Sequence, residues 1–352
     1  MTTFFLNRLA TEPHALAFAG QSTPWPVALA DQTTDPSLDE ALRGHVAAAG
    51  RLLTPVAADL LATTGRPVDL FGFAPNPARL GAAADATASV EGVALTQLGA
   101  LLDLEHLGYG VAQAKPLAVL GHSQGVLAVH MTRAIEAAGS IEAAGTTLDE
   151  ILAVAALIGA AGTRRVRELG LNPKHGEASP MLSVKGATRV QVEALVARVN
   201  NARGPISIAV TNSDNHHVLS GYPEDLAAFA LEAEREHQHQ AKLREQKLHG
   251  GTVFNPTLEY LEVTLPFHSP LMADAVEQTV AWAGACGFDQ KRTRALAEEV
   301  LLNHVDWNAR VKALFDAADP SKLWIVDLGP GNTLGKLIGN VVQGTGIGVV
   351  EA

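Results

Sequence analysis

The sequence contains a single cysteine, Cys286, among 352 residues. One cysteine cannot close an internal disulfide or build a cysteine-based zinc site, and such scarcity fits a reducing cytoplasm. Basic residues are also outnumbered, with 26 Lys and Arg against 37 Asp and Glu and a net charge of -11. Nucleic acids and anionic membranes bind a basic face, so neither is expected as a partner.

Long apolar runs are missing as well. Residues 151–162, ILAVAALIGAAG, form the longest run of small and apolar side chains, and a bilayer-spanning helix needs about 20. The N-terminal stretch is interrupted by Arg8, Glu12 and Pro13, so a signal peptide is not expected. Hydrophobic residues make up 47% of the chain, enough for a sizeable core. We therefore expect a folded cytoplasmic protein of about two domains.

What the sequence does contain is an alternation of apolar strands with amphipathic helices. The strands are expected over 14–22, 117–120 and 323–329, and the helices over 37–64, 90–110, 124–138 and 148–169. The proline-rich stretch 66–87 is expected to be a loop. Strands followed by sharp turns and helices indicate an α/β sheet with a site at the carboxyl ends of its strands.

A second pattern occupies residues 179–265. It reads as a strand, a helix, two strands and another helix, with LEVTLP (261–266) as a last strand. We expect a small α+β subdomain here, inserted in a larger α/β domain formed by 1–178 and 266–352.

The segment GHSQG (121–125) places Ser123 at a tight corner between an expected strand and an expected helix. Glycines on both sides permit a strained turn that presents the hydroxyl, and the helix start favours negative charge beside it. A serine becomes a useful nucleophile when a base accepts its proton. The segment therefore predicts a nucleophilic Ser123.

Among 13 histidines, His268 is the strongest candidate base. It follows an alternating apolar stretch in VTLPFHSPLM, where we expect a strand to end and a helix to begin. The alternatives are less suitable. His237, His239 and His249 lie in a charged, exposed stretch, and His237 and His239 face different ways on a helix, which argues against a shared metal. His216 and His217 adjoin an expected strand, and His122 is expected to point away from the corner.

Two glutamines complete a possible site. Gln21 follows the first expected strand, where its amide could donate to an oxyanion, and the backbone N–H of Gln124 directly follows the nucleophile. The glycine-rich stretch 329–339 is interpreted as a turn into the last helix. It is not a dinucleotide site, because Pro330 has no N–H and only 17 residues follow Gly335.

Six motifs now stand in order along the chain: FAGQS, GHSQG, VTNSDNHHVLSG, LPFHSPLM, NHVDW and DLGPGNTL. Together they resemble, over about residues 15 to 340, the malonyl/acetyl transacylases that load acyl groups onto fatty acid and polyketide synthases. GHSQGVLAV, LIGAAGT and GIGVV are most similar to the acetyltransferase domain of actinobacterial type I fatty acid synthases. The resemblance implies an α/β-hydrolase-like core with an inserted ferredoxin-like subdomain.

The resemblance also implies roles for single residues. Ser123 and His268 would form a catalytic dyad, with Gln21 and the Gln124 N–H as the oxyanion hole. Asp306 of NHVDW stands where the family has a group that orients the base, usually Gln or Asn and often through a backbone carbonyl. His122 and Asn212, in GHSQG and VTNSDNHHVLSG, are expected to contact substrate.

Ile158 marks a departure from the malonyl-specific members. Those carry an arginine on the helix after the serine corner, which pairs with the malonyl carboxylate, and the matching place in ALIGAAG is Ile158. A branched aliphatic side chain cannot pair with a carboxylate. We therefore expect acetyl transfer, with malonyl transfer as the alternative. If the matching is wrong, Arg164, Arg165 or Arg167 could take that role, although a basic helix end is the simpler interpretation.

The expected reaction moves an acetyl group from acetyl-CoA, through Ser123, to the phosphopantetheine thiol of an acyl carrier protein. CoA thioesters are substrates here, no permanently bound cofactor or metal is expected, and other fatty acid synthase domains are expected partners. Two rivals remain. A serine thioesterase usually has an Asp or Glu between Ser and His in the sequence, and its His lies near the C-terminus. Here 84 residues follow His268, which argues against a thioesterase. A non-catalytic scaffold would not need the complete Ser, His and Gln set.

Overall fold

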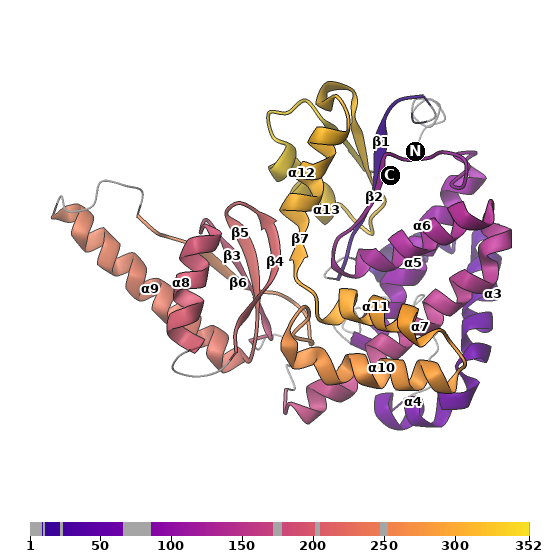
Figure 1. The fold of residues 1–352 in the computed structure, drawn as a ribbon, viewed down its shortest axis with the longest axis horizontal. Coiled ribbons are helices and arrows are strands. Elements are labelled where there is room, and N and C mark those ends of the chain that lie inside the picture. Colours follow the sequence, from indigo (N-terminus) through magenta and orange to yellow (C-terminus); the bar gives the residue numbers. More distant parts are fainter. Residues whose placement is uncertain are drawn as a thin grey trace.

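The computed structural model describes residues 9, 11–21, 24–65, 86–171, 178–200, 205–246 and 253–351. Within these residues the chain forms two β-sheets (Figure 1). The first has the strand order β2-β1-β8-β9 and contains β1 (His14–Phe18), β2 (Ala118–Gly121), β8 (Trp324–Asp327) and β9 (Gly348–Glu351). The second has the order β6-β3-β5-β4-β7 and contains β3 (Met181–Lys185), β4 (Ser207–Ser213), β5 (His216–Ser220), β6 (Thr257–Tyr260) and β7 (Val305–Asp306).

The first sheet is parallel, so its carboxyl ends share one edge. β1 pairs with β2 and with β8, and Phe18 lies opposite Gly121. The segments that follow β1 and β2 therefore emerge side by side, which brings 19–21 next to 122–124. Parallel pairing requires crossover connections, which helices supply here.

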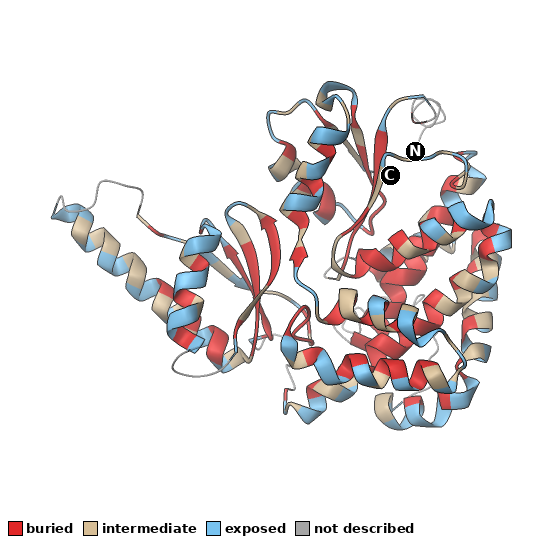
Figure 2. Ribbon diagram, in the orientation of Figure 1, coloured by how far each residue is buried: buried red, intermediate tan, exposed pale blue. Residues whose placement is uncertain are grey.

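Helices surround this sheet and bury a large apolar core. They are α2 (Trp25–Gln32), α3 (Pro36–Leu52), α4 (Ala57–Thr64), α5 (Ala86–His106), α6 (Val126–Ala138), α7 (Ile141–Glu168), α10 (Ala273–Ala285), α11 (Gln290–Leu301), α12 (Trp307–Ala317) and α13 (Thr333–Val342). Helices α5 and α7 pack against each other, and both are buried over most of their length (Figure 2).

Helix α7 has the length and composition of a membrane-spanning helix, and α3 with α4 would pass the same test as one bent span. In α7, however, 67% of the apolar window is buried inside the protein. The neighbouring helices therefore cover most of its apolar surface, as expected for a core helix.

The second sheet carries two helices on one face. Along the chain the order is β3, α8 (Arg189–Asn200), β4, β5, α9 (Pro223–Glu245) and β6. Helices α8 and α9 cover the face that points away from the first sheet (Figure 1), and they close a separate apolar core with Leu182, Val184 and Leu219. Strand β7 pairs with the edge strand β4, so the chain beyond residue 265 extends this sheet. The domain boundary at 265 stays a prediction.

Several elements differ from the sequence predictions. Residues 261–266 do not form a strand. Pairing with β3 ends at the hydrogen bond from the Leu261 N–H to the Met181 carbonyl, because the preceding Pro180 has no N–H and its carbonyl accepts from Gly221. The helix expected over 37–64 breaks at a short 3-10 turn, Thr54–Val56, where Pro55 removes a backbone donor. Helix α7 begins at Ile141, not 148, and Ser140 caps it. Strand β9 was not predicted. Residues 66–85 of the expected loop 66–87 lie outside the described residues. The last two residues of that stretch already belong to α5, which begins at Ala86.

Candidate active site

Ser123 sits at the turn between β2 and α6. Its φ is +53°, and a 3-10 turn, Ser123–Gly125, leads into the helix. The neighbouring glycines are required by space. A Cβ on Gly121 would lie 2.5 Å from the Gly125 carbonyl carbon, and one on Gly125 would lie 2.2 Å from the Phe18 oxygen. Left-handed backbone at a non-glycine residue is costly, and it is typical of functional positions.

His268 lies against this serine. The Ser123 hydroxyl donates to His268 Nε2 at 2.8 Å, and His268 Nδ1–H donates to the Asn303 carbonyl at 2.7 Å. The second bond fixes the tautomer that leaves Nε2 free to accept a proton. Burial lowers the pKa of His268 to about 3, with smaller contributions from the neighbouring His122, His304 and Arg310. The imidazole is therefore neutral at neutral pH and can act as a base.

The segment after β1 approaches the same turn. A Cβ on Gly20 would meet the His122 carbonyl at 2.7 Å and Ser123 Cβ at 2.8 Å, so only glycine allows this contact. Gln21 follows, and its Oε1 accepts from Gln124 Nε2 at 3.1 Å. Gln21 Nε2 is then buried with no partner among the described residues. An unused buried donor beside the serine is suited to receive developing negative charge.

His122 links the turn to the second sheet. Its Nε2 lies 2.8 Å from Asn212 Oδ1, at the end of β4, and its ring packs edge-on against Trp307 at 5.3 Å. Asn212 is buried. The pKa of His122 is lowered, and the burial of its own ring is the main cause. The serine corner is thereby tied to the small subdomain across the cavity.

A cavity of about 930 Å³ contains these groups. It lies between the carboxyl ends of the first sheet and the open face of the second. Gln21, His122, Ser123, Asn212 and His268 all line it. The volume is at the upper end of the range for small-molecule sites. Among the described residues no three His, Cys, Asp or Glu side chains gather closely enough to hold a metal ion.

Comparisons with known proteins find similarity to fatty acid synthases. The family model "Fatty acid synthase central AT domain" matches residues 180–260. The fatty acid synthase beta subunit TOXC of Cochliobolus carbonum is 27% identical over 270 residues, which cover 66% of this chain and 12% of that protein. Fatty acid synthase subunit beta of Saccharomyces cerevisiae is 27% identical over 214 residues, 53% of this chain and 10% of that protein. The chain thus spans a small part of these relatives.

Solved structures share the fold over nearly the whole chain. An acyl carrier protein S-malonyltransferase from Vibrio cholerae superposes with a TM-score of 0.64 at 15% identity, covering 96% of both chains. The PlMCAT:AntF complex of a malonyl-transacylase and its acyl-carrier protein gives 0.64 at 16% identity, covering 97% and 96%. The sequence matches to fatty acid synthase acyltransferase regions and the shared fold of the malonyltransferases support a likeness to acyl carrier protein transacylases.

The predicted fold class is confirmed. The α/β-hydrolase-like core corresponds to the parallel sheet and its helices, and the ferredoxin-like subdomain corresponds to β3 to β6 with α8 and α9. The site assignments remain predictions, although the structure brings Ser123, His268, Gln21, Gln124, His122 and Asn212 together. His268 does not end a strand. It lies in the loop between β6 and α10 with a φ of +55°.

Asp306 is not where a base-orienting side chain would be. Its carboxylate accepts from the Ala309 N–H at 2.9 Å and caps α12. The group that orients His268 is the Asn303 carbonyl, three residues earlier. Asn303 is the first residue of the same NHVDW segment, so the resemblance indicated the right segment and the carbonyl, but the assignment to Asp306 was wrong.

Ile158 is fully buried in α7 and does not line the described cavity. Its predicted contact with the acyl group is therefore not supported by the structure. The neighbouring glycines explain the packing: a Cβ on Gly159 would meet the backbone of Thr87 at 2.9 Å, and one on Gly162 would meet Leu265 at 2.5 Å. Ile158 sits in a tightly packed helix whose neighbours fill the space around it.

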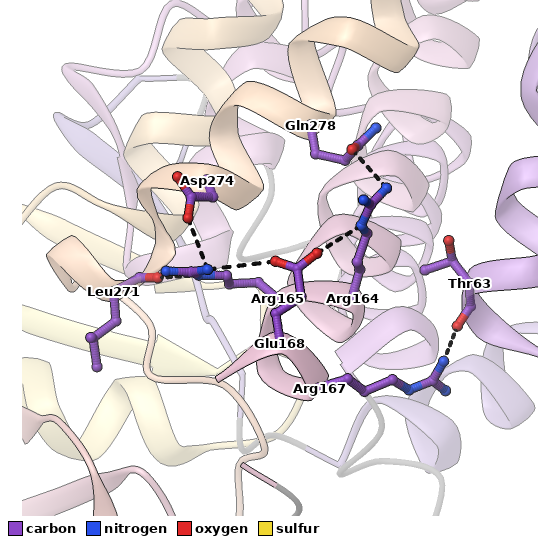
Figure 3. A network of polar contacts seen from close by, with 8 residues as sticks. All are labelled: Thr63, Arg164, Arg165, Arg167, Glu168, Leu271, Asp274 and Gln278. Carbon is purple, nitrogen blue, oxygen red and sulfur yellow. Dashed lines mark hydrogen bonds and ion pairs between the residues drawn. The ribbon is translucent and has the colours of Figure 1, made fainter. Parts of the chain in front are cut away.

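The three arginines after it are engaged elsewhere (Figure 3). Arg165 donates to the Leu271 carbonyl and pairs with Asp274 at 2.8 Å, while Arg164 binds Glu168 and Gln278. Arg167 donates to the Thr63 carbonyl. None of these arginines lines the cavity. Their contacts hold the end of α7 to α4 and to α10. This agrees with the simpler interpretation, a basic helix end.

Other residues at the site were missed from the sequence. Gln97 of α5 donates to the Ala19 carbonyl at 2.5 Å and so holds the segment that carries Gln21. Arg310 of α12 donates to the Gly121 carbonyl at 2.7 Å. Neither residue stands in a recognisable motif.

The other candidate histidines lie in different places. His216 lines the cavity and is hydrogen-bonded to Ser183 at 3.1 Å. His237 donates to the Phe254 carbonyl and does not line the cavity, and His249 lies outside the described residues.

Proposed function

We propose that this chain transfers acyl groups from CoA thioesters to the phosphopantetheine thiol of an acyl carrier protein. The observation that carries the proposal is the bond from Ser123 to His268, with the unused amide of Gln21 beside it. A nucleophile, a neutral base and a preorganised donor in one cavity are the parts that acyl transfer needs.

In the proposed reaction Ser123 Oγ attacks the thioester carbonyl while His268 Nε2 accepts its proton. The oxyanion is held by Gln21 Nε2 and the Gln124 N–H. The C–S bond breaks, and the CoA thiolate leaves with the proton from His268. The carrier thiol then attacks the seryl ester in the reverse sense. The Asn303 carbonyl keeps the ring oriented and helps stabilise the imidazolium.

Acetyl is the proposed acyl group, and the reaction would prime fatty acid synthesis. Support comes from the lining of the cavity, which includes no arginine among the described residues. Two of its lysines already pair with acids, Lys185 with Glu259 and Lys312 with Asp214. Lys336 of α13 also lines the cavity and has no ion pair among the described residues, which keeps malonyl transfer as the second candidate.

We further propose that the CoA thioester is a transient substrate, with no resident cofactor. An acyl carrier protein and other fatty acid synthase domains would be the partners, in the cytoplasm. Attachment to a carrier within one polypeptide or complex would offset repulsion between two acidic proteins by raising the effective concentration.

The test is to incubate the protein with acetyl-CoA or malonyl-CoA and offer either pantetheine or water alone. Acyl-pantetheine should form much faster than free acid, and acetyl-CoA should give the larger kcat/KM. Rapid hydrolysis without transfer would make the protein a thioesterase. A larger kcat/KM for malonyl-CoA would favour the second candidate.

A further inference from the structure

One face of the second sheet forms a wall of the cavity. Along β3 the side chains of Met181, Ser183 and Lys185 line the cavity, whereas the alternate residues Leu182 and Val184 lie in the apolar core under α8 and α9. A strand points successive side chains to opposite faces, so this division follows from the strand itself. Strands β4 and β5 add their own cavity-facing residues to the same wall.

The wall changes character along the strands. At one end Lys185 pairs with Glu259 at 3.1 Å and both are exposed. In the middle Ser183 and His216 are hydrogen-bonded at 3.1 Å. At the other end the lining is apolar, with Met181 on β3 and the cross-strand pair Val210 and Val218.

The apolar end adjoins the reacting groups. Val210 lies two residues before Asn212, which holds His122 next to Ser123. Val210 also pairs with Val305, two residues after Asn303, which holds His268. Phe267, directly before His268, lines the cavity too. The apolar patch is therefore placed beside the dyad, between the two contacts that position it.

We propose that Met181, Val210, Val218 and Phe267 form a binding site for the acyl chain, and that linear acyl-CoA thioesters longer than acetyl are substrates. This rests on the proposed function, and butyryl- and hexanoyl-CoA are the tested cases. The polar band of Ser183 and His216 offers hydrogen-bond partners for the amides of the pantetheine arm.

The chemistry is unchanged by chain length. The ester bond to Ser123 Oγ forms as the C–S bond breaks, and the proton passes through His268 to the CoA thiolate. The longer chain only adds buried apolar surface. Each buried methylene strengthens binding by about four-fold.

The experiment measures kcat/KM for acetyl-, butyryl- and hexanoyl-CoA with pantetheine as acceptor. The wild type should use butyryl- and hexanoyl-CoA within about tenfold of acetyl-CoA or better. Val218→Phe, which fills the apolar end, should lower the value for hexanoyl-CoA at least about tenfold more than the value for acetyl-CoA. Val190→Phe is the matched control, because Val190 lies on α8 and is 75% exposed.

If Val218→Phe does not fold, Val218→Thr keeps the volume and should lower the hexanoyl to acetyl ratio. The proposal is overturned if the wild type uses hexanoyl-CoA more than about tenfold less well than acetyl-CoA, or if the folded Val218 variant leaves the ratio unchanged. Absence of transfer from every CoA ester would instead contradict the proposed function. In that case calorimetry with Ser123→Ala still decides the acyl site, since hexanoyl-CoA must bind more tightly than acetyl-CoA.

Discussion

At the scale of single residues, the orientation of His268 depends on a backbone carbonyl. In Ser-His-Asp triads a buried carboxylate holds the imidazole. Here the Asn303 carbonyl does so, and Asp306, the nearest acid in that segment, caps a helix. A carbonyl stabilises the imidazolium less than a carboxylate would, which is consistent with a buried ring whose pKa is strongly lowered.

His268→Ala should slow formation of the acyl-enzyme by about 10² to 10⁴-fold, the usual contribution of a general base. The burst of CoA release on mixing with acetyl-CoA measures this rate. His239→Ala, in the exposed part of α9, is the control and should be close to wild type. A normal burst in a folded His268→Ala variant would remove His268 from the mechanism.

The pH dependence of acylation follows from the same burial. A base must be unprotonated, and a pKa of about 3 keeps His268 neutral through the mildly acidic range. We expect kcat/KM for acetyl-CoA to stay level from about pH 8 to about pH 5, whereas an ordinary histidine would lose activity below about 6.5. An acid limb centred near 6.5, with the circular dichroism spectrum unchanged, would contradict the lowered pKa.

The lowered pKa of His268 also makes the folding stability depend on pH. The folded state does not bind the proton that the unfolded chain takes up, so stability is present above about pH 6.5 and falls as the pH drops toward 3. Circular dichroism at each pH separates this loss from a loss of the base.

At the scale of elements, helix α7 contradicts the simplest view of substrate selection. Ile158 packs inside the helical core, so Ile158→Arg would bury a guanidinium without a partner. We expect a loss of about 3–5 kcal/mol in the free energy of unfolding and no gain of malonyl transfer. Denaturant titration measures the first and steady-state kinetics the second.

Leu231→Arg on α9 is the matched control, because Leu231 is 63% exposed, and it should change the free energy of unfolding by less than about 0.5 kcal/mol. A stable Ile158→Arg variant that gained malonyl transfer would return Ile158 to the acyl pocket.

The elements also show what sequence patterns can and cannot predict. The corner at Ser123 and the strand–helix–strand–strand–helix unit follow from local glycine spacing and periodicity, and both were predicted. Strand β9 and the end of β6 at Tyr260 were not, because pairing partners far along the chain decide them. Gln97 and Arg310 donate to backbone carbonyls across the fold, and no local sequence pattern records such contacts. Asn303 acts through its own carbonyl, so its side chain does not distinguish it from its neighbours in NHVDW.

At the scale of the whole molecule, the cavity is shared between the two sheets, and the bond between His122 and Asn212 joins its two sides. Asn212→Leu would leave His122 Nε2 without that partner, an unsatisfied group that costs about 1–3 kcal/mol. We expect a fall of about tenfold to a hundredfold in the acylation rate and a lower Tm. Asn308→Ala, which removes an exposed bond to Asp214, is the control. Equal effects of the two variants would mean that the His122 contact has no special role.

The central claim is that Ser123 carries the acyl group between CoA and the carrier thiol. It is tested most directly by mixing the protein with acetyl-CoA, quenching with acid and analysing the digest by mass spectrometry. The account predicts one added acetyl group on the peptide that contains Ser123, its loss when pantetheine is added, and no modification in Ser123→Ala. An acetyl group that forms equally in Ser123→Ala, or one that pantetheine does not remove, would contradict it.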